Sequence, residues 1–130
     1  MASRIVIPAT AFAATNRRTK RQRADSGDYL DFIRSLPCLI TGDPSQAAHV
    51  NYDDLRYGKI GRGKGTKDDD CWAVPLSEPL HRQQHDAGDE RKWWLYQGID
   101  PVPVALALWR CWQLHDYETA LIVIQHAGQP

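Results

Sequence analysis

Two histidines four residues apart are the part of this sequence best suited to chemistry. His81 and His85 fall in a segment of helical character, and residues four apart on a helix project from one face with Cβ atoms roughly 5–6 Å apart. Imidazole nitrogens bind divalent ions, so the pair can supply two ligands to one metal. The spacing alone is equally typical of a solvated helix face, because helix surfaces produce such pairs by chance.

A third histidine precedes them in an apolar setting. His49 is flanked by Ala47, Ala48 and Val50 in a short run of strand character. A single histidine among apolar neighbours is more often a hydrogen-bonded structural residue than a catalyst. If that strand packs beside the face of the following helix, however, two histidines can hold a metal while the third faces a water. Near pH 7 a neutral imidazole can serve as base or as ligand.

The strands that would position these histidines are expected to be short. Residues 38–40 and 47–50 are apolar runs separated by a turn-forming segment, 41–45, so we expect them to form a hairpin. Residues 53–70 are rich in glycine and charge and are interpreted as a loop. A third extended segment is expected at 72–76.

Helices are expected before and after these strands. Apolar residues at helical spacing predict a helix over 28–36, which Pro37 ends. A second should begin at Ser77, which can cap it, and run through His85. Further helices are predicted over 89–97 and from the caps Asp100 and Asp116 onward. This order of helix, strands and further helices predicts an α+β domain.

The distribution of charge divides the chain in two. Residues 1–24 carry basic side chains and no acidic ones, and are interpreted as a basic arm before a single domain at 25–130. The formal net charge is zero, so a global basic field does not account for nucleic-acid binding. Local basic groups can contact phosphates, although such stretches are equally typical of solvated loops. In the glycine-rich loop we predict three contacts with a nucleic-acid backbone: Arg62, Lys64 and Lys67.

Cysteine usage and hydropathy set the expected compartment. Three widely spaced cysteines argue against a disulfide framework and for a reducing compartment, and Cys111 is interpreted as a small buried residue. No apolar run approaches the roughly 20 residues of a membrane span. We therefore expect a cytoplasmic protein with no membrane partner.

Several motifs around the histidines carry a resemblance to a known family. The most specific are Ala47-Ala48-His49-Val50, the Val-Pro-Leu run that leads to both helical histidines, and Gly98-Ile99-Asp100-Pro101. Over roughly residues 28–110 the chain resembles the HNH-like (ββα-metal) endonucleases of phages and prophages, and more distantly the RecA-dependent phage nuclease. The resemblance implies a small core of β-hairpin and helix, with an N-terminal helix and additional C-terminal helices.

The resemblance also implies roles for the histidines. His49 matches the general base that takes a proton from the attacking water, and His81 and His85 match the metal ligands. One divalent ion is implied, Mg²⁺ or Mn²⁺ first, with Zn²⁺ or Ni²⁺ as further candidates. It would contact a phosphate oxygen of DNA and stabilise the leaving 3′-oxygen. A recombination protein is a further partner that the distant relative implies.

The sequence departs from the family pattern at a ligand position. Many HNH enzymes carry Asp or His directly before the base, where this chain has Ala48. Asp70 or Asp69 can supply the missing oxygen, and Asp70 can instead orient His81, as carboxylates behind a ligand do. A run of three aspartates is also typical of a solvated loop.

A second departure concerns a structural zinc that relatives hold with four cysteines. Cys38 is present, but the other matching positions are Thr41, Ser77 and Leu80. Threonine and leucine cannot replace thiolates, so we predict that the structural zinc is absent.

Three functions remain open at this point. The first is metal-dependent hydrolysis of DNA. The second is a catalytically degenerate HNH-like domain that binds DNA or a recombination partner without cutting, which Ala48 and the missing cysteines favour. The third is an interaction module in which the three histidines hold a structural ion, so that chelation would unfold the protein.

Overall fold

The protein has a mixed α+β architecture. In the computed structural model the described residues are 27–60 and 69–128, and they form five α-helices, two 3₁₀ turns and two β-strands. In chain order the elements are α1 (Gly27–Arg34), β1 (Gln46–His49), η2 (Leu55–Tyr57), η3 (Asp70–Trp72), β2 (Ala73–Leu76), α2 (Glu78–Asp86), α3 (Glu90–Gln97), α4 (Pro101–Gln113) and α5 (Tyr117–His126). The predicted α+β class and the order of the helices are confirmed.

The two strands pair in a way that the sequence did not predict. β1 lies antiparallel to β2, with Gln46 opposite Leu76 and His49 opposite Ala73. The hairpin expected between residues 38–40 and 47–50 is therefore wrong. Residues 38–43 instead close on themselves, since the Cys38 amide donates to the Asp43 carbonyl at 2.7 Å and the amide of Gly42 donates to the Cys38 carbonyl at 2.8 Å.

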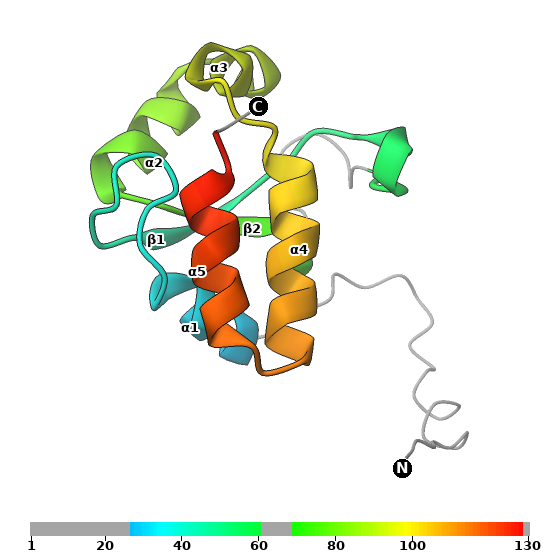
Figure 1. Cartoon of the computed structure of the whole chain (residues 1–130). Coiled ribbons are helices and arrows are strands. Elements are labelled where there is room, and N and C mark those ends of the chain that lie inside the picture. The colour runs from blue at the N-terminus through cyan, green and yellow to red at the C-terminus, as the bar shows by residue number, and fades with distance from the viewer. Residues whose placement is uncertain (1–26, 61–68, 129–130) are drawn as a thin grey trace.

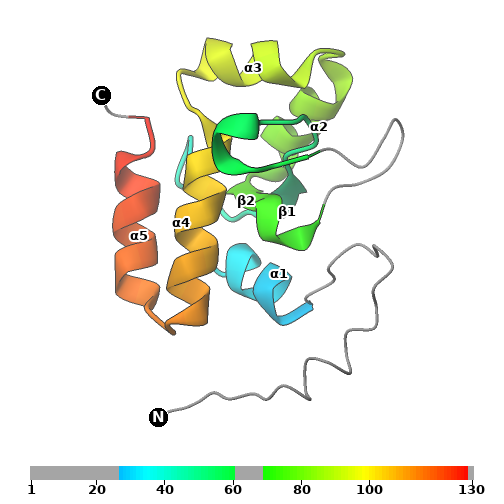
Figure 2. The same ribbon diagram turned by 90° about the vertical axis from the view of Figure 1, so that its right-hand side faces the viewer.

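Helices cover the small sheet and make the core with it. α1 and α4 both contact β2, and α5 packs on the outside of α4, as the two views show (Figures 1 and 2). Apolar residues at helical spacing supply the contacts, among them Tyr29 and Ile33 on α1 and Val102 and Leu108 on α4, all fully buried. Every residue of β2 is buried. Burial of β2 therefore fixes the position from which α2 begins.

The helix boundaries follow from their capping residues. The Asp89 side chain accepts from the Lys92 amide at the start of α3, and the Asp116 side chain accepts from the Thr119 amide at the start of α5. α3 ends at Gly98, whose positive φ of 75° is a conformation that glycine adopts without strain. Ser77 is the N-cap of α2, as expected from the sequence, although its side chain makes no capping hydrogen bond.

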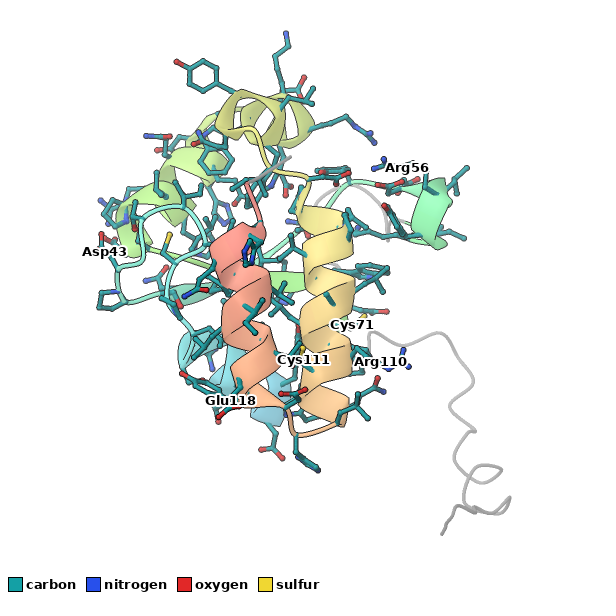
Figure 3. The ribbon with its side chains drawn as sticks, viewed as in Figure 1. Asp43, Arg56, Cys71, Arg110, Cys111 and Glu118 are labelled. Atoms are coloured by element: carbon teal, nitrogen blue, oxygen red, sulfur yellow. The ribbon has the colours of Figure 1, made fainter. Side chains whose placement is uncertain are left out.

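Two further expectations concern burial and the basic arm. Cys111 on α4 is buried, which confirms its interpretation as a core residue (Figure 3). Among the residues that the structure describes, no helix has the length and apolar character needed to cross a bilayer. The arm predicted over residues 1–24 lies outside the described residues.

Candidate functional site

The two histidines of α2 face each other closely. Nε2 of His81 lies 3.2 Å from Nε2 of His85, and the ring centroids are 4.8 Å apart. Two imidazole nitrogens bound to one tetrahedral ion at about 2.0–2.1 Å are separated by roughly 3.3 Å. The observed distance therefore fits a pair of ligands on a single divalent ion, and the donor set suits such an ion chemically.

Gln46, the first residue of β1, contacts the first of these histidines. Its Oε1 lies 2.8 Å from Nδ1 of His81. A carbonyl oxygen only accepts hydrogen bonds, so Nδ1 donates and the neutral ring keeps its lone pair on Nε2, the atom that faces His85. Sequence reasoning missed Gln46, and its place directly before Ala47-Ala48-His49 was the one signal that pointed to it.

His49 makes a pair of its own with Asp70. Its Nε2 lies 2.8 Å from Oδ1 of Asp70, and the two side chains are 9% and 4% exposed. The fold explains the meeting, because His49 ends β1 opposite Ala73 and Asp70 begins the turn that leads into Ala73. An ionised carboxylate is an acceptor, so Nε2 of a neutral His49 carries the proton and Nδ1 keeps the lone pair.

The predicted site residues thus form two pairs. His81 lies with His85, and Asp70 lies against His49 rather than against the helical histidines. Within residues 27–60 and 69–128, no group of three or more His, Cys, Asp or Glu side chains is arranged to hold a metal ion. The predicted DNA contacts at Arg62, Lys64 and Lys67 lie outside these ranges.

A carboxylate on α3 joins the end of β1 to α2. Glu90 accepts from the Asn51 amide at 3.2 Å, from Nε2 of Gln84 at 2.9 Å and from Nε1 of Trp94 at 3.3 Å. Burial raises the pKa of Glu90 above its ordinary value, although the hydrogen bonds from Asn51 and Trp94 oppose the shift. Glu90 therefore fixes the position of α2 relative to the strand that carries His49.

Cys38 lies among the positions that hold zinc in the resembled family. Its Sγ accepts from the amides of Ile40 and Thr41 at 3.4 and 3.5 Å. Burial raises the pKa of this thiol, but hydrogen bonds from Thr41, Ile40 and Ser77 together lower it below its ordinary value. Three of the four matching positions are therefore neighbours in space, with one thiol and two hydroxyls in place of thiolates.

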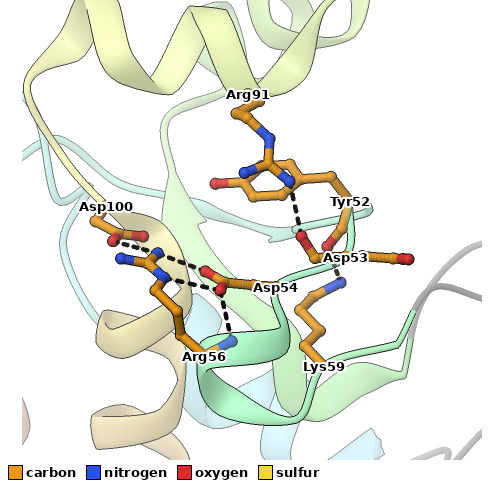
Figure 4. Close-up of polar contacts among 7 residues, drawn as sticks. All are labelled: Tyr52, Asp53, Asp54, Arg56, Lys59, Arg91 and Asp100. Carbon is orange, nitrogen blue, oxygen red and sulfur yellow. Dashed lines mark hydrogen bonds and ion pairs between the residues drawn. The ribbon is translucent and has the colours of Figure 1, made fainter.

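A separate pocket of about 440 Å³ lies between the η2 turn and the α3–α4 junction. Arg56 spans it, contacting Asp54 at 2.6 Å and Asp100 at 2.9 Å (Figure 4). Hydrogen bonds to these carboxylates raise the pKa of Arg56, and the bond from Arg56 lowers that of Asp54. Arg91 stacks on the Tyr52 ring at 4.5 Å. The pocket is lined by Tyr52, Arg56, Arg91, Trp94, Leu95, Gly98, Ile99 and Asp100.

Fold and side chains together define a small α+β protein with a histidine pair on one helix and a His–Asp pair at the end of a strand. Comparison with protein families places it more closely. Residues 5–108 match the family described as "Protein of unknown function (DUF968)", and the chain belongs to that family. Neither the curated proteins nor the solved structures contain a significant match to this chain.

Proposed function

We propose that this protein is a divalent-metal-dependent endonuclease of the HNH-like kind that hydrolyses phosphodiester bonds in DNA. The observation that carries the proposal is the 3.2 Å separation of the two Nε2 atoms of His81 and His85. The order β1, β2, α2 around this pair supports it, because a strand, a strand and a helix are the parts of a ββα core. The motif resemblance around His49 supports the choice of DNA as substrate.

The residues of the chain divide the chemistry between them. Asp70 holds His49 through Nε2, which leaves Nδ1 to take a proton from the attacking water. The same contact stabilises the imidazolium that forms after the transfer, because the charge develops beside a carboxylate. His81 and His85 would hold the ion, which supplies Lewis-acid stabilisation of the phosphate oxygens and the leaving 3′-oxygen.

Two imidazole nitrogens also bear on the choice of metal. Mg²⁺ prefers oxygen ligands, whereas Mn²⁺, Zn²⁺ and Ni²⁺ accept imidazole more readily. Asp70 faces His49 in this structure, so the helical pair offers nitrogen alone from the described side chains. Of the two ions named first from the sequence, Mn²⁺ is the better supported.

A supercoiled-plasmid nicking assay tests the proposal. Wild type, His49→Ala and the matched control His126→Ala, an exposed histidine on α5, are compared in Mg²⁺, Mn²⁺, Zn²⁺, Ni²⁺ and EDTA. We expect nicking by wild type and the control in at least one metal, none in EDTA, and a loss of about 10²–10⁴-fold in His49→Ala. Absence of cutting by folded wild type in every metal would reject the enzyme.

The degenerate DNA-binding domain remains the second candidate, and one observation favours it. Side chains alternate along a strand, so His49 leaves β1 on the opposite face from Gln46, the residue that contacts His81. With His49 only 9% exposed, its bond to Asp70 also suits a structural role.

This candidate predicts a gel shift with DNA, no cutting, and loss of thermal stability in His49→Ala. Charge reversal at Arg62, Lys64 and Lys67 should then weaken the shift and flatten its salt dependence.

A further inference from the structure

Gln46 is an exposed side chain that nonetheless makes a short, directed contact. It lies 35 residues before His81 in the chain, yet its Oε1 is 2.8 Å from Nδ1 of that ring. Ordering a glutamine side chain costs rotamer entropy, so such a contact on an exposed side chain calls for a reason.

The backbone brings both partners to the same end of the sheet. Gln46 begins β1 opposite Leu76, the last residue of β2. Ser77 follows directly and is the cap of α2, and its carbonyl accepts from the His81 amide at 2.8 Å. The first turn of α2 is thus anchored to β2, and Gln46 reaches it from the neighbouring strand.

The chemical identity of the contacting atom decides what His81 can do. A carbonyl oxygen at Nδ1 requires the proton there and leaves the lone pair at Nε2, 3.2 Å from Nε2 of His85. With the proton on Nε2 instead, His81 could not ligate an ion from the side that faces His85. Hydrogen bonds of this kind orient a ligand ring and raise its basicity, and their loss typically costs 10–100-fold in metal affinity.

We propose that Gln46 is the positioning residue of the histidine pair, holding His81 in the Nδ1–H tautomer so that both Nε2 atoms are presented to one divalent ion. This inference rests on the metal site of the proposed function. It assigns to the start of β1 a role that is separate from the base at the end of the same strand.

Titration of the full chain with nickel chloride, with binding affinity measured by calorimetry, tests the role of Gln46. Gln46→Ala should weaken binding at least about tenfold, whereas Gln46→Glu should keep wild-type affinity because its carboxylate also accepts from Nδ1. Gln113→Ala, at an exposed glutamine that ends α4, is the matched control and should bind as wild type does. Equal affinity in wild type and Gln46→Ala, or equally weak binding in Gln46→Ala and Gln46→Glu, would overturn the inference.

A second readout needs no metal. Nitrogen NMR of the metal-free protein distinguishes the two ring tautomers, and His81 should be protonated on Nδ1 in wild type and on Nε2 to a large extent in Gln46→Ala. The positioning role would be overturned if His81 had the same tautomer in Gln46→Ala as in wild type. It would also be overturned if the wild-type protein bound no nickel. If nickel binding depends on Gln46 but no plasmid is nicked in any metal, the positioning role stands and the nuclease proposal falls.

Discussion

The histidine pair on α2 and the arginine pocket beside η2 show two different uses of polar side chains. In the pocket, Arg56 lies between the carboxylates of Asp54 and Asp100, and Arg91 donates to the Asp53 carbonyl at 2.8 Å. These groups satisfy one another. In the histidine pair, two ring nitrogens approach within 3.2 Å, so Nε2 of His81 either accepts a proton from Nε2 of His85 or shares a cation with it.

The difference separates the proposed binding region at α2 from the pocket, whose paired charges support the fold. Charges that are paired within the protein mainly hold its segments together, and here they fasten the loop after β1 to the start of α4 (Figure 4). Ligand atoms that converge on one point are suited to an ion from outside. Substitutions in the two regions should therefore differ in what they change, stability in the pocket and metal-dependent activity at α2.

The largest effect is expected at the pair itself. His85→Ala removes one of the two proposed ligand nitrogens from an exposed position, so nicking in Mn²⁺ should fall at least about 100-fold with little change in melting temperature. Arg56→Ala should leave nicking within about twofold, because the described hydrogen-bond partners of Arg56 are Asp54 and Asp100, neither of them in the proposed site. Plasmid assays and thermal melts on the same preparations measure both. The reverse pattern, with activity lost in Arg56→Ala only, would move the site to the pocket.

Lys59 tests whether residues near the arginine pocket contribute mainly to stability. Its side chain is fully buried, with Nζ donating to the Tyr52 carbonyl at 2.6 Å and lying 5.5 Å from the Trp72 ring. Lys59→Ala removes this bond and leaves a cavity, so we expect a loss of about 2–4 kcal/mol in the free energy of unfolding. Lys92→Ala, at an exposed lysine on α3, is the control and should cost less than about 0.5 kcal/mol. Urea denaturation measures both values, and similar losses in the two variants would contradict the supporting role.

Sequence patterns predicted the helices well because their signals are local. The caps Asp89 and Asp116 and the terminating Gly98 act within one turn of their own helix, and each helix formed where expected. The pairing of β1 with β2 was missed because it joins segments separated by residues 50–72, and no local pattern encodes such a partner. The self-closed turn at residues 38–43 was equally invisible, since its hydrogen bonds depend on backbone conformation.

The same division applies to the candidate site. The close approach of His81 and His85 follows from helical spacing, so the sequence predicted it. The contacts of Gln46 with His81 and of Asp70 with His49 depend on strand register. Gln46 was not assigned from the sequence, and Asp70 was assigned to the metal or to His81 rather than to His49. Predictions from periodicity therefore reached the residues on one helix, but not the groups that orient them from other elements.

Glu90 lies between the two regions. Its titration should give a smaller, pH-dependent change in the free energy of unfolding. Its folded-state pKa is raised by burial, so the charged form is disfavoured in the fold, and its contribution to stability declines as pH rises through its ordinary and folded-state pKa values. Glu90→Gln removes this titration and leaves the other groups in place. The difference in unfolding free energy, wild type minus Glu90→Gln, should decrease from about pH 4 upward. A difference that grows with pH would show that hydrogen bonds outweigh burial at Glu90.

The smallest effect is expected from chelation. Cys38, Thr41 and Ser77 lie together, but one thiol and two hydroxyls are a poor ligand set for structural zinc. An ion bound by His81 and His85 alone is not needed to stabilise the core. EDTA should therefore shift the melting temperature of the wild-type protein by less than about 1 °C while it abolishes nicking. Elemental analysis of the purified protein should find zinc well below one equivalent.

Cys38→Ser, which keeps a polar side chain at that position, serves as the matched variant and should respond to EDTA as wild type does. A large fall in melting temperature confined to the wild type would instead place a structural zinc on Cys38, and a fall in both proteins would favour an ion held by the histidines for stability alone.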